Sequence, residues 1–467
     1  MLAERMTVEL VRHVTTRRLE EYSAEARHLA RNGILDFLAV TVAGGSDPLA
    51  GEISQIYRSD NNPSASFLGI GAGGEWVAAA AVNGFVSHVL DFDDMSVSIR
   101  GHPSAPVLSA LLPLAGLRRA AGRDLLLAYM AAVDGMALVG RILATPIQEA
   151  GFHTTATLGS LGTALACGIL MELEARQLEC AVSLALAQGG GLVANFGTPA
   201  KPMQVGLASA AGARAAELAR HGVQGSPRAI EAMCAMLGVE PDLPRNFVSD
   251  WEEGRISFKR YPSCSLTHQA IEAGKRLKRK LGRLQAEAIT VHGSYRVPAM
   301  LHHPVPEDRY QVKFSLPYCL AVAMVFDGPL AGYLSPALPE KRVLDLARKM
   351  KFRIHPDLAD ASTIDDEFTL VEVRCRSGET LSDMVKEKIA IVDRSELLTK
   401  ASWCLKSRGL SLGVERLADM VENVEALRDV NELVALVNPE GARAAGPPLT
   451  EVESASPAAR SGSTVRR

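Results

Sequence analysis

The 467-residue sequence lacks long apolar stretches and a secretory signal. No uninterrupted apolar run reaches the roughly 18 residues that a membrane-spanning helix needs. The first six residues, Met1-Leu-Ala-Glu-Arg-Met6, do not form the apolar core of a signal peptide. We therefore expect a cytoplasmic protein that does not bind a membrane.

Neither a charge excess nor a cysteine pattern points to nucleic acid, disulfides or metal. The 50 Lys and Arg residues nearly balance 53 Asp and Glu residues, for a net charge of −3, so the basic excess of a nucleic-acid binder is absent. The seven cysteines are scattered singly without a CxxC pair. That pattern favours reduced thiols and argues against a structural zinc or iron–sulfur site.

Aromatic residues are also scarce, at 5%, whereas alanine and glycine are frequent. From residue 23 to about residue 237 the apolar pattern is helical nearly throughout. Small residues recur along these segments, for example Gly159 with Gly162 and Ala208 with Ala211. They predict a bundle in which helices approach one another closely.

The pattern changes after about residue 259. Residues 288–292 and 369–375 read as short strands, the second followed by the turn Ser377-Gly378, and helical stretches at 316–324 and 340–351 lie between them. Residues 397–404 and 414–436 are helical again. The sequence therefore predicts a mainly α fold with a second α+β domain: a helical domain from 1–258 and 397–440, an α+β lid domain at 259–396, and a disordered tail at 441–467.

The most informative segment contains three carboxylates and a nearby histidine. Asp91, Asp93 and Asp94 fall within four residues, and His102 directly precedes an expected helix with Ser104 as its N-cap and Pro106 in the first turn. The N–H groups and dipole at a helix N-terminus favour an anion. This arrangement predicts acid–base chemistry on an acidic substrate.

The same arrangement recurs twice. His153 precedes the helical run that begins near residue 158, and Lys201 precedes the run from residue 203. Three such sites predict converging helix N-termini that bind several carboxylates. Lys259, at the predicted domain junction, could add a fourth cation, and Tyr318 could reach the cleft from the second domain.

Two tempting motifs carry less weight. The run Gly69-Ile-Gly71-Ala-Gly-Gly74 satisfies G-x-G-x-x-G, but no second parallel strand follows the next helix. We interpret it as a loop rather than a dinucleotide site. Cys264 lies in a loop near Lys259, but no His-Asn set accompanies it as a nucleophile would require.

These residues resemble the MmgE/PrpD family over about residues 10–440. The resemblance is carried by six blocks in order: His88-x-x-Asp91-Phe-Asp-Asp94 after Asn83-Gly; Gly101-His-Pro-Ser104; Gly151-Phe-His153 with Gly159-x-x-Gly162; Asn195-Phe-Gly-Thr198-x-x-Lys201-Pro202; Lys259-x-Tyr-Pro262-x-Cys264-x-x-Thr267-His268; and Lys313-Phe-Ser-x-x-Tyr318.

The resemblance implies a homodimer and cofactor-free, metal-free chemistry on di- or tricarboxylates, as in 2-methylcitrate dehydratases, cis-aconitate decarboxylases and an iminodisuccinate epimerase. Two positions depart from it: Met95 stands where Thr or Ser is common, and Cys264 stands where cis-aconitate decarboxylase has His. Both departures make decarboxylation the less favoured reaction. The family's active-site positions carry over to Asp91, His102, His153, Lys201, Lys259 and Tyr318.

We accordingly expect a lyase, most simply a dehydratase. His102 is the expected general acid or base, oriented by Asp91, while Asp93 and Asp94 only shape the turn. His153, Lys201 and Lys259 would hold substrate carboxylates, with Cys264 and Met95 as further contacts, and Tyr318 would donate a proton or hydrogen bond. An epimerase, a decarboxylase and a non-catalytic anion-binding protein remain alternatives.

Overall fold

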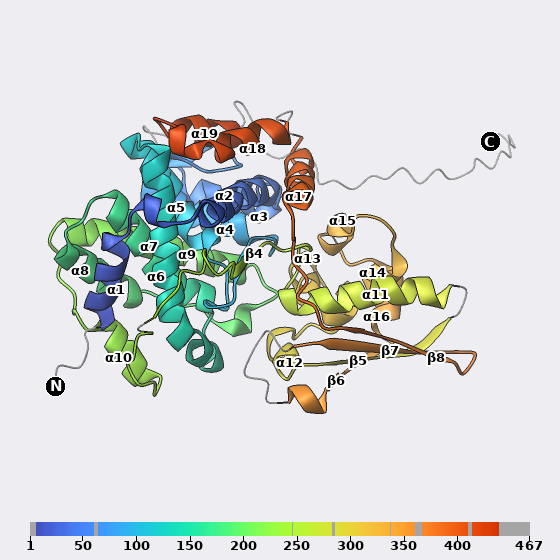
Figure 1. Cartoon of the computed structure of the whole chain (residues 1–467). Coiled ribbons are helices and arrows are strands. Elements are labelled where there is room, and N and C mark those ends of the chain that lie inside the picture. Colours follow the sequence, from blue (N-terminus) through green and yellow to red (C-terminus); the bar gives the residue numbers. More distant parts are fainter. Residues whose placement is uncertain are drawn as a thin grey trace, which may run out of the picture.

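The structure, a computed structural model, describes residues 6–59, 64–244, 246–282, 285–336, 338–359, 367–409 and 413–438. It consists of a larger helical domain and a smaller domain with a sheet, as the sequence predicted (Figure 1). The tail expected at 441–467 lies outside the described residues.

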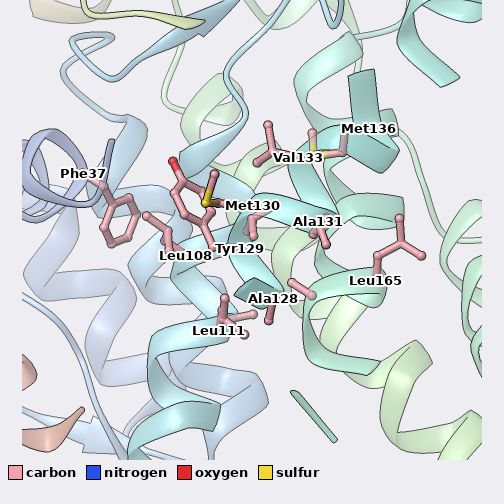
Figure 2. Packing of buried hydrophobic residues seen from close by; sticks show 14 of the residues in the cluster. Phe37, Leu108, Leu111, Ala128, Tyr129, Met130, Ala131, Val133, Met136 and Leu165 are labelled. Carbon is pink, nitrogen blue, oxygen red and sulfur yellow. The ribbon is translucent and has the colours of Figure 1, made fainter. Parts of the chain in front are cut away.

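The helical domain is built around one apolar core. The long helix α6 (Gly122–Glu149) runs through this core, and Figure 2 shows Phe37, Leu108 and Leu165 packed close to Tyr129 and its neighbours on that helix. The helices of the N-terminal part are α1 (Met6–Thr16), α2 (Ala24–Gly44), α3 (Pro48–Tyr57), α4 (Trp76–His88), α5 (Ser104–Arg118), α6 (Gly122–Glu149), α7 (Thr154–Leu170), α8 (Ala175–Leu186), α9 (Ala200–Arg220) and α10 (Ala229–Met236).

Helix α6 is long and apolar enough to cross a membrane by length and composition. However, 83% of its apolar window is buried inside the protein. Burial on this scale is what the core helix of a helical domain requires.

Small residues allow α4 and α9 to touch at the backbone. A Cβ added to Gly84 would lie 2.6 Å from the Cα of Gly206, and one added to Gly206 would lie 2.1 Å from the carbonyl oxygen of Ala81. Only glycine fits such contacts without displacing a helix. The close helix packing predicted from small residues therefore occurs here, and it sets the distance between two helices that carry site residues.

The C-terminal helices return to the helical domain. The helix α17 (Arg394–Ser407) packs on α2, and α18 (Val414–Glu422) and α19 (Asn431–Val437) lie beside it at the top of Figure 1. Leu397, Ala401 and Leu417 join the same core as the N-terminal helices. The single helix expected over 414–436 is wrong, because a 3₁₀ turn at Val424–Ala426 separates α18 from α19.

The second domain places helices on a four-stranded sheet. The strand order is β6-β5-β7-β8, with β5 and β6 parallel and the other pairs antiparallel. The strands are β5 (Ala286–Gly293), β6 (Met350–Ile354), β7 (Thr369–Cys375) and β8 (Thr380–Val385). The helices are α11 (His268–Leu281), α12 (Arg296–Met300), α13 (Arg309–Val312), α14 (Leu316–Val325), α15 (Ala331–Leu334) and α16 (Lys341–Ala347).

Both predicted strands are present, and two more were missed. The helix expected over 340–351 ends at Ala347, and β6 begins three residues later. Strand β6 is an edge strand in which Met350, Phe352 and Ile354 alternate with Lys351 and Arg353, a strand signal that is only five residues long and follows α16 closely.

Two short antiparallel strand pairs complete the helical domain. The strands β1 (Ala65–Ser66) and β2 (Gly73–Gly74) form a hairpin in which residues 69–72 of the glycine run are the expected loop and its last two residues are β2. The strands β3 (Met95–Ser96) and β4 (Ile256–Ser257) pair antiparallel, with Met95 opposite Ser257. This second pair brings the acidic segment beside the domain junction, where Lys259 follows β4.

Candidate active site

The acidic segment forms a strained turn at the C-terminal end of α4. We call residues 89–95 the aspartate loop. Asp91 adopts a left-handed backbone with φ of 51°, although it is not glycine. Such a conformation costs on the order of 1–3 kcal/mol and persists only where its surroundings enforce it, often at functional sites. Here the turn directs the Asp91 side chain at two lysines.

Asp91 is the centre of a buried ion-pair cluster. Its Oδ1 accepts a hydrogen bond from Lys201 Nζ at 2.6 Å, and its Oδ2 accepts one from Lys259 Nζ at 2.7 Å. All three side chains are buried. Burial alone would raise the pKa of Asp91, but the ammonium groups of Lys201 and Lys259 outweigh it and hold this pKa well below its usual value.

Asp93 contacts two histidines. Its Oδ2 lies 2.8 Å from His88 Nδ1 and 3.1 Å from His102 Nδ1. Burial would raise the pKa of Asp93, but His102 and His88 hold it well below its usual value. Asp91 is farther away, with its Oδ1 3.9 Å from His102 Nε2. The expectation that Asp91 orients His102 while Asp93 only shapes the turn is therefore wrong, since Asp93 is the nearer carboxylate.

Both histidines are neutral near neutral pH. Burial lowers the pKa of His88 to about 4, and burial also lowers the pKa of His102, with Asp93 opposing the shift only in part. We assign the proton of His102 to Nδ1, because this nitrogen lies 3.1 Å from Asp93 Oδ2, a close contact that lacks full hydrogen-bond geometry. Nε2 is then unprotonated, which is the form that a general base requires.

Asp94 does not line the cleft and instead binds the first residue of α5. Its carboxylate accepts hydrogen bonds from the backbone N–H and the hydroxyl of Ser104, and Ser104 also contacts Tyr129. Burial, together with the charges of Asp36 and Asp93, raises the pKa of Asp94 to about 8, against the hydrogen bonds from Ser104. The expected N-cap role of Ser104 is wrong: Pro103 is the N-cap, and Ser104 is the first residue of α5.

The three predicted helix starts meet at one cleft. His153 is the N-cap of α7, Lys201 is the second residue of α9, and His102 lies two residues before α5. All three line a cavity of about 180 Å³ between the domains. His153 Nδ1 lies 3.0 Å from Gln204 Oε1, and burial, reinforced by the charge of Lys201, lowers the pKa of His153 well below its usual value.

Two other predicted contacts also line this cleft, and one predicted residue does not. The cleft wall includes Met95 and Cys264. Burial, together with the charge of Asp91, raises the pKa of the Cys264 thiol, which opposes a nucleophilic role. The expectation that Tyr318 reaches the cleft is wrong, because its ring packs inside the second domain and its hydroxyl accepts the N–H of Glu340.

The sequence did not mark several titratable residues at the site. His88 was only part of a motif, although its i, i+5 spacing to Asp93 is a local signal that the two could meet across a turn. Arg100, which has a left-handed φ of 49°, and Arg296 line the cleft from opposite domains. Arg296 also pairs with Glu367 at 3.1 Å. No local pattern marks either arginine, because the fold brings them together.

The site also contains a group that resembles metal ligands. One donor atom each of His88, Asp91 and His102 lies within 4.8 Å of the others. However, Lys201 Nζ lies 2.5 Å from His88 Nε2 and 2.6 Å from Asp91 Oδ1. The ammonium thus already supplies the positive charge between these two groups, so the donor set fits a lysine better than an added cation.

Known proteins resemble the chain over most of its length. Residues 8–239 match the MmgE/PrpD N-terminal domain, and residues 261–426 match the MmgE/PrpD C-terminal domain. Cis-aconitate decarboxylase of Homo sapiens is 28% identical over 427 residues, which cover 83% of each chain. The Mus musculus protein of that name is 26% identical over 77% of this chain and 78% of its own.

A fungal relative extends the match. Cis-aconitate decarboxylase of Aspergillus terreus (strain NIH 2624 / FGSC A1156) is 24% identical, over 93% of this chain and 96% of its own. The two domain matches together cover both parts of the fold described above. The chain therefore belongs to the MmgE/PrpD family.

Proposed function

We propose that the protein is a lyase that acts on a small di- or tricarboxylic acid by acid–base catalysis, most simply by removing water. The observation that carries this proposal is the placement of neutral His102, backed by Asp93, on the same cleft as the ammonium groups of Lys201 and Lys259. A base beside fixed cations suits the removal of a proton next to a carboxylate, because the cations stabilise the charge that develops.

The cations give the cleft its preference for polycarboxylates. An ammonium has three donors, so Lys201 and Lys259 can each bind Asp91 and still offer a donor to a substrate. Arg100 and Arg296 add guanidinium groups to the cleft wall, and guanidinium is suited to bidentate carboxylate recognition. A substrate with two or three carboxylates could therefore be held at several points.

In the dehydration, His102 Nε2 takes the proton from a carbon next to a carboxylate. The electron pair of that C–H bond becomes the new C=C bond as the C–O bond to the neighbouring hydroxyl breaks. The hydroxide leaves as water after taking a proton from a cleft ammonium, Lys201 or Lys259. Return of the proton from His102 to the lysine, directly or through water, restores the starting state.

Decarboxylation of cis-aconitate is the second candidate. It is favoured by the relatives above, which carry the name cis-aconitate decarboxylase. In this reaction the C–C bond to a carboxylate breaks, CO₂ leaves, and the electron pair takes up a proton at carbon. Lys201 or Lys259 could donate this proton, so our preference for dehydration rests on neutral His102, a base that the decarboxylation does not use.

One experiment separates the candidates. The protein is incubated in D₂O with citrate, 2-methylcitrate, cis-aconitate and iminodisuccinate, and products and exchange are followed by proton NMR. An unsaturated acid formed from a hydroxy acid supports dehydration, and CO₂ with a decarboxylated product supports decarboxylation. Exchange without net conversion supports an epimerase. Binding without exchange or turnover of any acid would refute the enzyme proposal. The homodimer and the cytoplasmic location remain predictions.

A further inference from the structure

Three buried lysines hold the backbone of the aspartate loop. Lys313 Nζ donates to the carbonyl of Val89 at 2.8 Å, Lys259 Nζ to that of Asp91 at 3.0 Å, and Lys400 Nζ to that of Phe92 at 2.5 Å. These lysines come from the second domain, the junction and α17. The loop thus receives donors from three separate parts of the chain.

The position of these donors has a physical reason. The last carbonyls of a helix have no partner within it and carry the negative end of the helix dipole, so cations are favoured there. Val89 is the C-cap of α4, and the left-handed turn at Asp91 follows two residues later. Without external donors these carbonyls would be buried and unpaired, and the strained turn would lose the contacts that enforce it.

The positive charge of Lys400 is balanced by an aspartate that lies outside the cleft. Its Nζ lies 2.6 Å from Asp36 Oδ1 on α2 and 4.1 Å from the ring centroid of Phe92. Lys400 does not line the cleft. Its contacts therefore position the loop and do not reach a substrate.

The surroundings of Lys313 disfavour its charged form. Its Nζ lies 5.1 Å from the ring centroid of Tyr310, and burial lowers the pKa of Lys313 to about 8, although Asp47 and Asp91 oppose the shift. The backbone of the same residue accepts the N–H of Cys264, which is on the cleft wall. Lys313 therefore connects the second domain to the aspartate loop, and its backbone also holds the cleft-wall residue Cys264.

We propose that Lys313 and Lys400 are positioning residues that fix the aspartate loop, and that Lys313 makes the placement of Asp91 depend on how the second domain is seated. The effect on turnover rests on the proposed function. The effect on the histidines does not, because His88 and His102 contact Asp93 in the same loop. A purely structural role would lower stability without changing these histidines.

The test compares Lys313→Met and Lys400→Met with Lys278→Met. Lys278 is the control, because its partly buried Nζ also donates to a backbone carbonyl, that of Val325, and pairs with Asp327 as Lys400 pairs with Asp36, but Lys278 does not line the cleft. The readouts are kcat and KM on the acid that the wild type converts, and the titration of His88 and His102 followed by NMR of ¹³C-labelled histidine. Circular dichroism verifies the fold.

We expect both loop variants to lower kcat at least tenfold, with KM changed less than about threefold, and to shift the His88 and His102 titrations. Lys278→Met should change neither the kinetic constants nor the titrations of the two histidines. Arginine at position 313 or 400 should restore part of kcat, because it keeps the charge and the donors. If a methionine variant does not fold, the glutamine and arginine variants at that position replace it, with the same contrast expected.

Two results would overturn the proposal. The first is a folded Lys313→Met or Lys400→Met protein with wild-type kcat and wild-type histidine titrations. The second is a set of equal shifts in the Lys278→Met control. A wild type that converts no polycarboxylate would instead refute the proposed function, and the histidine titrations would still decide the positioning role.

Discussion

The Nε2 atom of His88 lies 2.5 Å from the Nζ atom of Lys201. An ammonium can only donate, so this contact makes Nε2 the acceptor and leaves the His88 proton on Nδ1, which faces Asp93. The two contacts define one tautomer and link Asp93 to Lys201. Asp93 Oδ2 also lies 3.1 Å from His102 Nδ1, so one carboxylate contacts both histidines.

The two histidines should therefore differ in importance. His102→Asn should lower kcat by about 10²–10⁴-fold, the usual contribution of a positioned acid–base group. His88→Asn should lower it by about 10- to 100-fold, since a hydrogen bond to a charged group contributes about 1.5–3 kcal/mol and 1.4 kcal/mol corresponds to a factor of ten. Steady-state kinetics measures both.

The matched control for this pair is His292→Asn. His292 pairs with Glu372 on the sheet of the second domain, away from the cleft. This variant should keep wild-type kcat. A His102→Asn protein as active as the wild type would remove His102 from the mechanism, and equal losses in all three variants would show a general effect on folding.

The pH dependence of kcat/KM should reveal the state of His102. A base must be unprotonated, and the pKa of His102 is lowered below its ordinary 6.5 by burial. Activity should therefore fall only as the pH drops below 6.5. Asp93 favours the protonated form of His102, so Asp93→Asn should move the acid limb to still lower pH while reducing kcat. A limb above pH 6.5, or an upward shift in Asp93→Asn, contradicts the assignment.

Local patterns located the helix starts to within a few residues: α7 begins at Thr154 and α9 at Ala200, rather than near the expected 158 and 203, so Lys201 lies inside α9. His153 and Lys201 were found because capping and polar residues directly before an apolar run mark a helix N-terminus, and that signal lies within a few residues. The strands at 288–292 and 369–375 were found in the same way, from local apolar content. Such features depend on neighbours in the chain.

The residue roles that the sequence did not reveal depend on contacts between distant parts of the chain, which neighbouring residues do not encode. The role of Asp93 follows from the left-handed turn at Asp91, which directs it at His88 and His102. Lys400 meets the loop from more than 300 residues away, with no motif to mark it. Tyr318 lies on a helix apolar on all sides, so the sequence did not show which way its ring would face.

The arginines of the cleft wall should control affinity for tricarboxylates. Arg296→Gln should raise KM by about tenfold or more with little change in kcat, because loss of a charge-assisted hydrogen bond costs about 1.5–3 kcal/mol. A dicarboxylate that cannot span the cleft should be affected less. Glu367→Gln is the control, since it removes the partner of Arg296 and should leave KM unchanged or lower it. Equal changes for both acids would argue against a separate carboxylate contact.

Asp94 should make the protein less stable as the pH rises. Its folded pKa is about 8 and its ordinary value is 3.8, so between these values the folded state holds a proton that the unfolded state has lost. The free energy of unfolding therefore decreases with pH across this window, and the loss is absent below about pH 4. Asp94→Asn removes the titration and keeps one oxygen that can accept the Ser104 backbone N–H, while its NH₂ group can donate to the Ser104 hydroxyl oxygen.

The Asp94→Asn variant should consequently gain stability relative to the wild type as the pH is raised from 5 to 8. Urea unfolding at several pH values measures the difference. Asp345→Asn is the control, because Asp345 is half-exposed and pairs only with surface cations. Its difference from the wild type should stay nearly constant over the same range. Parallel curves for Asp94→Asn and the wild type would mean that Asp94 is ionised in the folded protein, and that Ser104 and its neighbours stabilise a buried charge rather than a neutral acid.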